Sequence, residues 1–366
     1  MENMVARSPD LHFWQSKKVL VTGHSGFKGA WLVQVLKSLS CEIVGYGLPL
    51  MSSPSVYEQS NTFSAVSNTK YGLPEFIDIN EISAIHAAFH KFQPDIVFHL
   101  AAQPLVLEGY RNPVQTFQTN VMGTVNVLDA IRATASAQAV VIVTTDKVYQ
   151  NEGGTLPYKE NDRLGGVDPY SASKTCAEFI TACYRESFFQ TLGIPIATAR
   201  AGNVIGGGDW SLDRLIPDII RACNKCEDVT LRNPHAIRPW QHVLEATWGY
   251  LRLAECLCHG GEAFSQGYNF GPFETHNMTV DEVTKLVLRL MGSNSQVKYD
   301  EVAQFNEAQV LSLDASRAKN ELAWVPKLSA RQAINLTCEW YREQQKGLSS
   351  KTLFENQIKE YFEINL

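Results

Sequence analysis

Two short motifs in this chain contain residue types that could perform a reaction together. Residues 22–29 read TGHSGFKG after the apolar run 19–21, and residues 170–174 read YSASK. A GxxGxxG between a strand and a helix is typical of a dinucleotide site, because its glycines let the backbone approach a pyrophosphate at a helix N-terminus. Tyr170 and Lys174 lie one helical turn apart, so we expect the ammonium to favour the phenolate and lower its pKa. Together the motifs predict an enzyme that moves protons beside a bound dinucleotide.

A third group of polar residues follows the apolar run 140–143, which we expect to be a strand. The carboxyl ends of strands hold the ligand in open α/β sheets. Thr145 could donate a hydrogen bond to a reacting oxygen, and Asp146 could act as a general acid if its surroundings raise its pKa. A helix cap, or an ion pair with Lys147, is the structural alternative for Asp146.

The residues that follow the second expected strand do not identify the cofactor. No acidic residue follows it at residues 45–48 to bind the ribose hydroxyls, and no arginine is there to bind a 2′-phosphate. Asp78 could hold the adenine amino group or cap the next helix. Lys28 could cover the pyrophosphate or lie in solvent. These residues alone leave both NAD and NADP open.

Strand-like and helix-like segments alternate along the first two hundred residues, which indicates a parallel sheet covered on both faces. We therefore expect an α/β fold of the doubly wound Rossmann type with a smaller mixed α/β lobe. The cofactor domain is predicted at 1–205, with elements near 236–270 returning to it, and the substrate lobe at 206–366. The strands are expected at 18–22, 41–46, 76–79, 95–100, 139–144, 196–199 and 229–232. The helices are expected at 27–38, 82–91, 114–133, 171–188, 214–226, 244–257, 280–290 and 330–344.

Composition excludes several other classes of protein. The 366 residues carry a net charge of −6, which argues against a nucleic-acid binder. No apolar run is long enough for a membrane span or signal peptide, so we expect a cytoplasmic protein without membrane contacts. The eight cysteines are scattered. Cys223 and Cys226 have zinc-like spacing without a matching second pair, so we expect reduced thiols and no metal.

Longer motifs carry a resemblance to a known family. They are HLAAQPLV at 99–106, TDK at 145–147, RAGNVIGGGDW at 200–210 and IRPWQHV at 237–243. With the two motifs above, they resemble the extended short-chain dehydrogenase/reductase superfamily, and within it the nucleotide-sugar 4,6-dehydratases that act on CDP-glucose. The similarity runs from about Phe13 to the LAWVP segment at 322–326. Relatives that act on dTDP-glucose have Asp-Glu where this chain has Asp146-Lys147.

The resemblance implies an internal redox cycle on a nucleotide sugar. Tyr170 takes the 4-hydroxyl proton while a hydride leaves C4 for NAD, a base removes the C5 proton, Asp146 protonates the departing 6-hydroxyl, and the hydride returns to C6. The product is a 4-keto-6-deoxy sugar nucleotide, which serves 6-deoxy or 3,6-dideoxy sugar synthesis for a bacterial surface glycan such as the O-antigen of lipopolysaccharide. We expect Lys147 to be the C5 base or to relay a proton to it, and the alternative is that Lys147 only orients Asp146.

The same resemblance implies the site residues and the assembly. The catalytic residues are Thr145, Asp146, Lys147, Tyr170 and Lys174. The cofactor residues are Gly23, Ser25, Gly26, Phe27, Lys28, Gly29, Asp78, Ile79, Ala101, Ala102, Gln103, Asn120, Thr144, Tyr170 and Lys174. The substrate residues are Asn203, Arg214, Arg232, His235, Arg238 and Asn269. A homodimer, or a dimer of dimers, is expected through the helices at 114–133 and 171–188.

Three alternatives remain open from the sequence. The family has an arginine after QPLV, whereas this chain has Leu107-Glu108, so the preference for sugar or nucleotide could differ. A 4,6-dehydratase or C4-epimerase of a dTDP-, UDP- or GDP-linked sugar is the alternative enzyme, and an epimerase needs no acid at C6. A dinucleotide-sensing protein of the same fold would need neither Tyr170 nor Lys174 nor Asp146.

Overall fold

A six-stranded parallel sheet forms the centre of the computed structural model, which describes residues 8–49, 54–151, 153–154, 156–272, 278–300 and 310–363. The strand order is β2-β1-β3-β4-β5-β9. The bounds are β1 Lys18–Thr22, β2 Glu42–Tyr46, β3 Ile96–His99, β4 Ala139–Val143, β5 Ile196–Ala201 and β9 Gly267–Phe270. Because β2 and β3 flank β1 on opposite sides, the strand order reverses at β1, which is where such sheets bind ligands.

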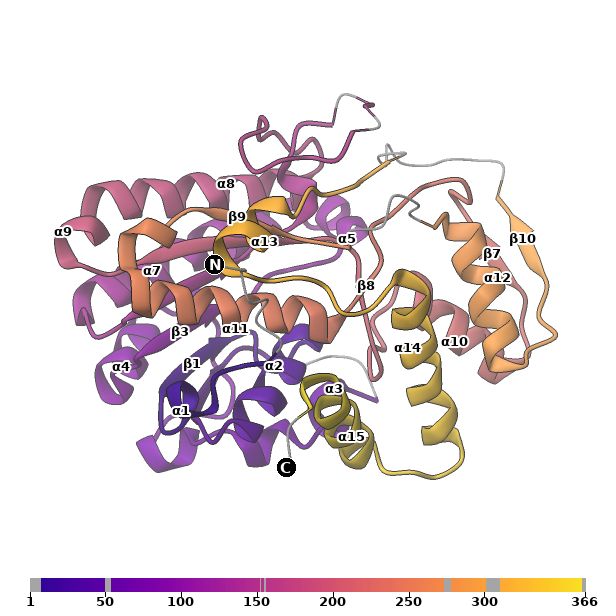
Figure 1. Ribbon diagram of the computed structural model, residues 1–366, viewed down its shortest axis with the longest axis horizontal. Coiled ribbons are helices and arrows are strands. Elements are labelled where there is room, and N and C mark those ends of the chain that lie inside the picture. The colour runs from indigo at the N-terminus through magenta and orange to yellow at the C-terminus, as the bar shows by residue number, and fades with distance from the viewer. Residues whose placement is uncertain are drawn as a thin grey trace.

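Helices cover both faces of this sheet (Figure 1). On one face α4 (Ile82–Phe92) and α7 (Gly123–Thr134) pack against alternate residues of the strands, such as Val97 and Ile142. On the other face α2 (Phe27–Ser38) and α11 (Val243–Gly260) pack against Val21 and Val141. This alternation follows from the period of two along each strand and explains why the strands are apolar throughout. The Rossmann-type doubly wound fold expected from the sequence is confirmed.

A second lobe lies beside the sheet domain, at the right of Figure 1. We use that name for α10 (Leu215–Lys225), β7 (Val229–Leu231), α12 (Val280–Met291), β10 (Val297–Tyr299) and α14 (Ala330–Gln345). Strands β7 and β10 pair in parallel. A two-stranded sheet of β6 (Val204–Ile205) and β8 (Gln241–His242) joins the lobe to the sheet domain, and α15 (Ser350–Phe362) returns to α2, where Phe354 packs on Trp31 with ring centroids 4.3 Å apart.

Two long helices each contain a π turn. The helix expected at 114–133 consists of α6 (Pro113–Phe117), the π turn Gln118–Met122 and α7. The helix expected at 171–188 consists of α8 (Pro169–Tyr184), the π turn Arg185–Phe189 and α9 (Gln190–Leu192). Such turns are frequent at functional sites.

The strand expected at 76–79 is wrong. The segment contributes one backbone hydrogen bond beside the main sheet, from the Ile77 N–H to the Gly47 carbonyl at 2.9 Å, and then turns at Asp78 and Asn80. Pro74 has no N–H to donate and the turn follows at once, so no strand ladder forms. Between β2 and this segment the chain forms α3 (Val56–Gln59) and two 3₁₀ turns, Thr62–Ala65 and Asn68–Tyr71.

Short elements missing from the sequence-based expectation complete the chain. They are α1 (Leu11–Trp14), α5 (Val106–Arg111), the 3₁₀ turns Asp146–Val148 and Gly261–Phe264, and α13 (Ser316–Leu322). Among the described residues, no helix is long and apolar enough to span a membrane.

Candidate active site

A cavity of about 1170 Å³ opens at the carboxyl ends of β1, β3, β4 and β5, between the sheet domain and the second lobe. Its wall contains Gly23 after β1, Thr145 after β4, Gly202 after β5 and Arg232 after β7. The cavity therefore lies where the strand order reverses, the position at which open α/β sheets bind ligands. All five predicted catalytic residues line it.

The glycine-rich turn forms one end of this cavity. Gly23 has φ +73°, and a Cβ there would lie 2.7 Å from the backbone nitrogen of Ala101. A Cβ on Gly29 would overlap the Gly23 carbonyl, so both positions require glycine. Gly26 caps α2 without a side-chain hydrogen bond, which leaves the first N–H groups of the helix facing the cavity. An uncapped helix N-terminus behind a glycine turn fits the pyrophosphate of a dinucleotide.

The other predicted cofactor residues divide into two groups. Ser25, Phe27, Lys28, Asp78, Ile79, Ala101, Ala102 and Thr144 also line the cavity. Gln103 and Asn120 do not line it, and they fix its wall instead. The Asn120 side chain accepts from the Gln103 N–H at 2.7 Å and donates to Ser173 Oγ on α8 at 2.8 Å. The π turn that contains Asn120 thus joins the Ala101–Gln103 loop to the helix carrying Tyr170.

Two of the cofactor candidates already have partners in the protein. Ser25 Oγ donates to the Leu48 carbonyl at 2.5 Å. Asp78 Oδ1 accepts from the backbone N–H and the side-chain amide of Asn80, both at 2.9 Å. Asp78 is not a helix cap, because α4 begins after Glu81.

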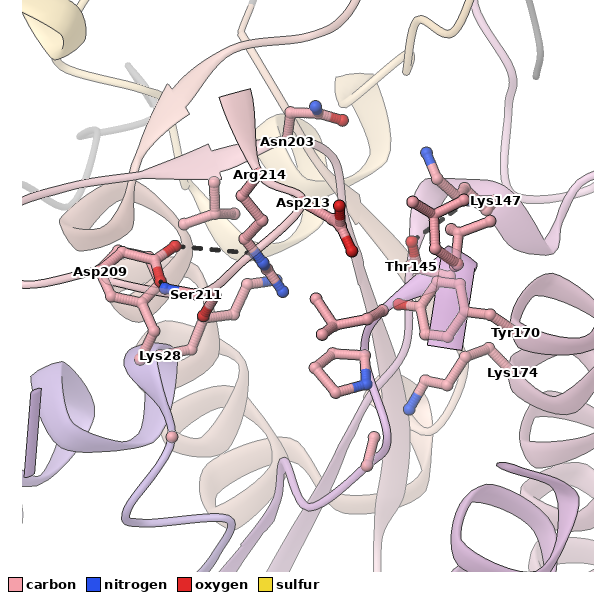
Figure 2. Close-up of a pocket in the computed structure, with 18 of the residues that line it drawn as sticks. Lys28, Thr145, Lys147, Tyr170, Lys174, Asn203, Asp209, Ser211, Asp213 and Arg214 are labelled. Atoms are coloured by element: carbon pink, nitrogen blue, oxygen red, sulfur yellow. Dashed lines mark hydrogen bonds and ion pairs between the residues drawn. The ribbon is translucent and has the colours of Figure 1, made fainter. Parts of the chain in front are cut away.

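Tyr170 and Lys174 extend from α8 into the cavity beside Thr145 (Figure 2). Asp168 caps this helix through a 3.0 Å bond from the Ser171 N–H, and Pro169 occupies its first turn. The Lys174 ammonium donates to the Val143 carbonyl at 2.7 Å, at the end of β4. The helical spacing therefore presents both groups on one face, as predicted.

The ionisation of these two groups differs from the expectation. Burial raises the pKa of Tyr170 to about 12, and the opposing hydrogen bond with Thr145 and the charge of Arg214 do not compensate. Burial lowers the pKa of Lys174 to about 8, against the carboxylate of Glu178, which raises it. The expectation that Lys174 brings the tyrosine pKa below its usual value is therefore wrong for the protein alone, because desolvation of the phenolate dominates.

Asp146 and Lys147 occupy the 3₁₀ turn that follows β4. Asp146 is 2% exposed, its Oδ1 accepts from Thr145 Oγ1 at 3.0 Å, and its Oδ2 is buried without a hydrogen-bond partner among the described residues. A buried carboxylate oxygen without a partner is costly, which points to a ligand group at that atom. Lys147 is half-buried in the same turn, and its ammonium points away from Tyr170 and Lys174 (Figure 2).

The opposite wall of the cavity carries cationic side chains beside the carboxylates of Asp209 and Asp213. Arg214, which precedes α10, reaches toward Lys28 across the cavity (Figure 2). Its Nη1 lies 3.9 Å from Asp209 Oδ2, and its buried Nε has no partner among the described residues. Burial, together with the charge of Arg214, lowers the pKa of Lys28 to about 7. Arg238 is buried and donates from Nη1 to the Ile237 carbonyl at 2.9 Å. These cations can bind phosphate groups.

The remaining candidates for substrate binding differ in whether they line the cavity. Asn203 and the exposed Arg232 line the cavity with Arg214 and Arg238. His235 is exposed and lies outside the cavity wall.

Asn269 does not reach the cavity either, and its predicted substrate contact is corrected. The residue is fully buried in β9; its amide donates to the Tyr158 and Asp314 carbonyls at 2.9 and 3.1 Å and accepts from the Tyr149 hydroxyl at 2.6 Å. Because these contacts fix the side chain within the protein, we assign Asn269 to the structural framework.

The departure from the family at Leu107-Glu108 also has a structural setting. Both residues lie on α5, where Leu107 contributes to the cavity wall. Glu108 lies 3.6 Å from Arg111 Nη1, and the same nitrogen lies 3.7 Å from Asp213 Oδ2, just before α10. A neutral side chain therefore occupies the cavity wall at the position where the resemblance implies an arginine, while Arg111, one turn later, lies 3.7 Å from Asp213 on the opposite wall.

Sequence reasoning missed the buried pair Glu178 and Arg200. Glu178 lies one turn beyond Lys174 on the same face of α8, and Arg200 opens the RAGN segment in β5. Arg200 Nε donates to Glu178 Oε1 and Arg200 Nη2 to Glu178 Oε2, each at 2.9 Å. The spacing of four after Lys174 was the available signal.

Comparison with known proteins gives a consistent family. The sequence profile described as GDP-mannose 4,6 dehydratase matches residues 20–337. The chain is 39% identical over 357 residues to a CDP-glucose 4,6-dehydratase from Salmonella typhimurium, covering 96% of this chain and 98% of the relative. It is 26% identical over 345 residues to a dTDP-glucose 4,6-dehydratase from Xanthomonas campestris, covering 89% of this chain and 93% of the relative.

Solved structures share the fold at lower sequence identity. A UDP-glucose 4-epimerase from Thermotoga maritima, solved with UDP-glucose, has a TM-score of 0.76 and 21% identity over 90% of this chain and 99% of its own. A dTDP-glucose 4,6-dehydratase from Bacillus anthracis, solved with NAD, has a TM-score of 0.71 and 23% identity over 90% of this chain and 98% of its own. At these identities the structures establish the fold.

Proposed function

The chain belongs to the GDP-mannose 4,6-dehydratase family, and we propose that within it the protein is an NAD-dependent CDP-glucose 4,6-dehydratase. One observation carries the proposal. Tyr170, Lys174 and an Asp146 carboxylate with an unpartnered oxygen line one cavity, behind a glycine turn that fits a dinucleotide. The near full-length relative that acts on CDP-glucose supports the choice of substrate.

The residues that would hold NAD are the glycine turn, Asp78 and Ile79 near the adenine, and Ala101, Ala102 and Thr144 along the dinucleotide. When bound, NAD supplies an acceptor for the hydride of C4 and returns it at C6. Lys28 lies where a pyrophosphate would meet the α2 N-terminus. Because burial lowers the pKa of Lys28 to about 7, an adjacent phosphate would favour its charged form.

Tyr170 accepts the proton of the sugar 4-hydroxyl as C4 is oxidised to a ketone. In the protein alone its pKa is raised to about 12, so the charged surroundings must stabilise the phenolate in the complex. Lys174 supplies one such charge, held at the end of β4 by the Val143 carbonyl. Thr145 supplies a hydrogen bond to the same reacting oxygen.

The 4-ketone acidifies the C5 proton, which allows loss of the 6-hydroxyl as water. Asp146 protonates that departing hydroxyl, and its buried Oδ2 is the atom available to do so. Lys147 follows in the same turn, and we assign it the removal of the C5 proton and the delivery of a solvent-exchangeable proton to C5 when the hydride returns to C6. The alternative is that Lys147 only orients Asp146.

The variant Lys147→Met separates these two roles. If Lys147 is the base, deuterium from solvent enters C5 at a rate reduced by about 10²-fold or more, while oxidation at C4 continues. Exchange at the wild-type rate in the variant would remove the base role from Lys147 and leave the orienting role.

The nucleotide is held by the second lobe and its junction with the sheet. Arg238 and Arg214 are suited to the diphosphate, since arginine binds such groups through two parallel hydrogen bonds. Asn203 lies at the same junction, and Arg232 lies at the exposed end of the cavity. We propose that the sugar lies toward Tyr170 and the base toward β7.

We also propose a homodimer in the cytoplasm. Large apolar side chains are exposed on the two helices expected at the interface. They are Val114 at 78%, Met122 at 50% and Phe179 at 57% exposure. Exposed apolar patches of this kind mark interfaces between chains. A monomer at micromolar concentration in sedimentation equilibrium would contradict the dimer, and Phe179→Lys is expected to weaken it.

Incubation of the purified protein with CDP-glucose and NAD in deuterated water tests the function. The expected product is CDP-4-keto-6-deoxyglucose with deuterium at C5, identified by NMR and mass spectrometry. Recovery of unchanged CDP-glucose, with turnover of a dTDP-, UDP- or GDP-linked sugar in the same assay, would overturn the substrate.

A further inference from the structure

The Glu178–Arg200 pair lies directly behind the reacting groups and touches none of the cavity. Glu178 is 5% exposed and Arg200 is 5% exposed, and neither lines the cavity wall. Each oxygen of the carboxylate accepts two hydrogen bonds. Oε1 accepts from Thr144 Oγ1 at 2.5 Å and Arg200 Nε at 2.9 Å, and Oε2 accepts from Thr198 Oγ1 at 2.7 Å and Arg200 Nη2 at 2.9 Å.

These bonds connect the catalytic helix to two strands. Glu178 belongs to α8, Thr144 follows β4, and Thr198 and Arg200 belong to β5. The Lys174 ammonium bonds to the Val143 carbonyl, the residue just before Thr144. Glu178 and Lys174, one turn apart on the helix, therefore attach to consecutive residues of the chain that leads to Thr145 and Asp146.

Arg200 extends the connection away from the cavity. Its Nη1 donates to the Tyr149 hydroxyl at 2.8 Å and to the Glu160 carbonyl at 3.0 Å. A Cβ on Gly267 would lie 2.8 Å from Arg200 Nη2, so β9 leaves room for the guanidinium. Each nitrogen of the guanidinium thus has a partner within the protein, and two of them hold the Glu178 carboxylate through both of its oxygens.

We propose that Glu178, clamped by Arg200, is a positioning residue that keeps the Lys174 amine charged and fixed at the end of β4. The inference rests on the proposed function, because it explains how that site keeps a cation beside Tyr170. Glu178 acts through Lys174 and contacts neither sugar nor cofactor. A carboxylate one turn from an ammonium in a buried setting favours the charged amine.

The other titratable groups around Lys174 either lower the pKa of its amine or carry no charge. Lys28 on α2 is a second cation whose charge is coupled to Lys174. His99 on β3 is buried with its pKa lowered to about 3, so it is neutral at physiological pH. Tyr170 on α8 is protonated in the protein alone. Glu178 is the anion that raises the pKa of Lys174, against desolvation by burial.

The test follows the titration of Lys174 itself by NMR of protein labelled at the lysine side chain, with Lys174→Met to assign the resonance. In Glu178→Gln the midpoint is expected to fall by roughly one pH unit or more, from about 8. The midpoint falls because loss of the negative charge of Glu178 favours the neutral form of the Lys174 amine. The same shift should appear in the alkaline limb of the pH profile of C4 oxidation.

A second variant allows for the instability that an unpaired buried arginine causes. In Glu178→Gln/Arg200→Met neither charge remains, and neutral replacements of buried pairs often preserve stability. The Lys174 midpoint there is expected to lie between those of the wild type and of Glu178→Gln, because removal of the Arg200 charge opposes part of the shift. A folded double variant with the wild-type midpoint would overturn the proposal and leave the pair a purely structural role.

Two matched controls separate charge from packing. Thr198→Val removes a hydrogen bond to Glu178 but keeps its charge, and Glu255→Gln changes a buried carboxylate on α11 that pairs with Arg252 at 2.9 Å. Neither is expected to move the Lys174 midpoint, and a shift in Glu255→Gln equal to that in Glu178→Gln would also overturn the proposal. Failure of the wild type to convert CDP-glucose would overturn the proposed function alone, since the titration needs no substrate.

Discussion

The charged groups around α8 and those around the N-terminus of α10 are arranged in opposite ways. Around α8, Glu178 and Lys174 are buried and bonded within the protein before any ligand arrives. Near α10, Arg214 has a buried Nε without a partner among the described residues, and Arg232 is exposed. Lys174 is thus fixed in advance, whereas Arg214 keeps unused hydrogen-bonding capacity for a ligand.

This contrast predicts different kinetic effects for the two regions. Variants around β4 and α8 should lower kcat with little change in substrate affinity. Variants of the cationic wall should raise KM and leave kcat within a few fold.

The largest effect is expected for Tyr170→Phe. The variant loses the group that accepts the 4-hydroxyl proton, so the overall rate should fall by about 10³-fold or more. Binding of NAD, measured by calorimetry, should change little because the ring remains in place. A variant with more than a tenth of wild-type activity would contradict the role of Tyr170. It would also contradict the contrast between the groups around α8 and those near α10.

Asp146→Asn is expected to stop the reaction at a later stage. C4 oxidation should continue, seen as nicotinamide absorbance in a single turnover, while loss of water falls by about 10²-fold. The amide keeps the shape of the side chain but cannot donate the required proton to the 6-hydroxyl. Full activity in this variant would favour a C4-epimerase, which needs no acid at C6.

Arg238→Met and Arg214→Met should act on binding. Each removes a charge-assisted contact, so KM for CDP-glucose should rise by about 10- to 100-fold. Arg232→Met is the matched control. Because Arg232 is exposed, the KM of this variant for CDP-glucose should rise only by about two- to threefold. Equal effects of all three would mean that burial does not separate the strong contacts from the weak one.

The last prediction concerns the pH dependence of the wild type. The free-enzyme pKa of Lys174, lowered by burial to about 8, should set an alkaline limb in kcat/KM. Above that pH the amine loses its proton and no longer stabilises the Tyr170 phenolate, so the rate should fall up to about tenfold per pH unit. A profile that stays flat to well above pH 9 would contradict the assignment of Lys174.

Local patterns in the sequence were sufficient for the residues that act through spacing along one element. Tyr170 and Lys174 are one helical turn apart, and Gly23 and Gly29 flank one turn, so their geometry follows from secondary structure. The pKa of Tyr170 could not be predicted in the same way, because burial depends on residues from several elements.

Contacts between distant strands could not be read from the chain. Asn269 was expected to bind substrate, but it pairs in register with Arg200 across β5 and β9 and belongs to the buried framework. Its side-chain direction depends on that register, which the sequence does not specify. The segment 76–79 likewise lacked the ladder partner that a strand needs.

Transfer of label within one sugar tests the central claim most directly. CDP-glucose carrying deuterium at C4 would be converted with NAD in ordinary water, and the product examined by NMR and mass spectrometry. The account predicts a 4-keto-6-deoxy product with deuterium moved from C4 to C6, because the hydride leaves and returns within one active site. A product that retains its oxygen at C6, or a C4 epimer with the label still at C4, would contradict it.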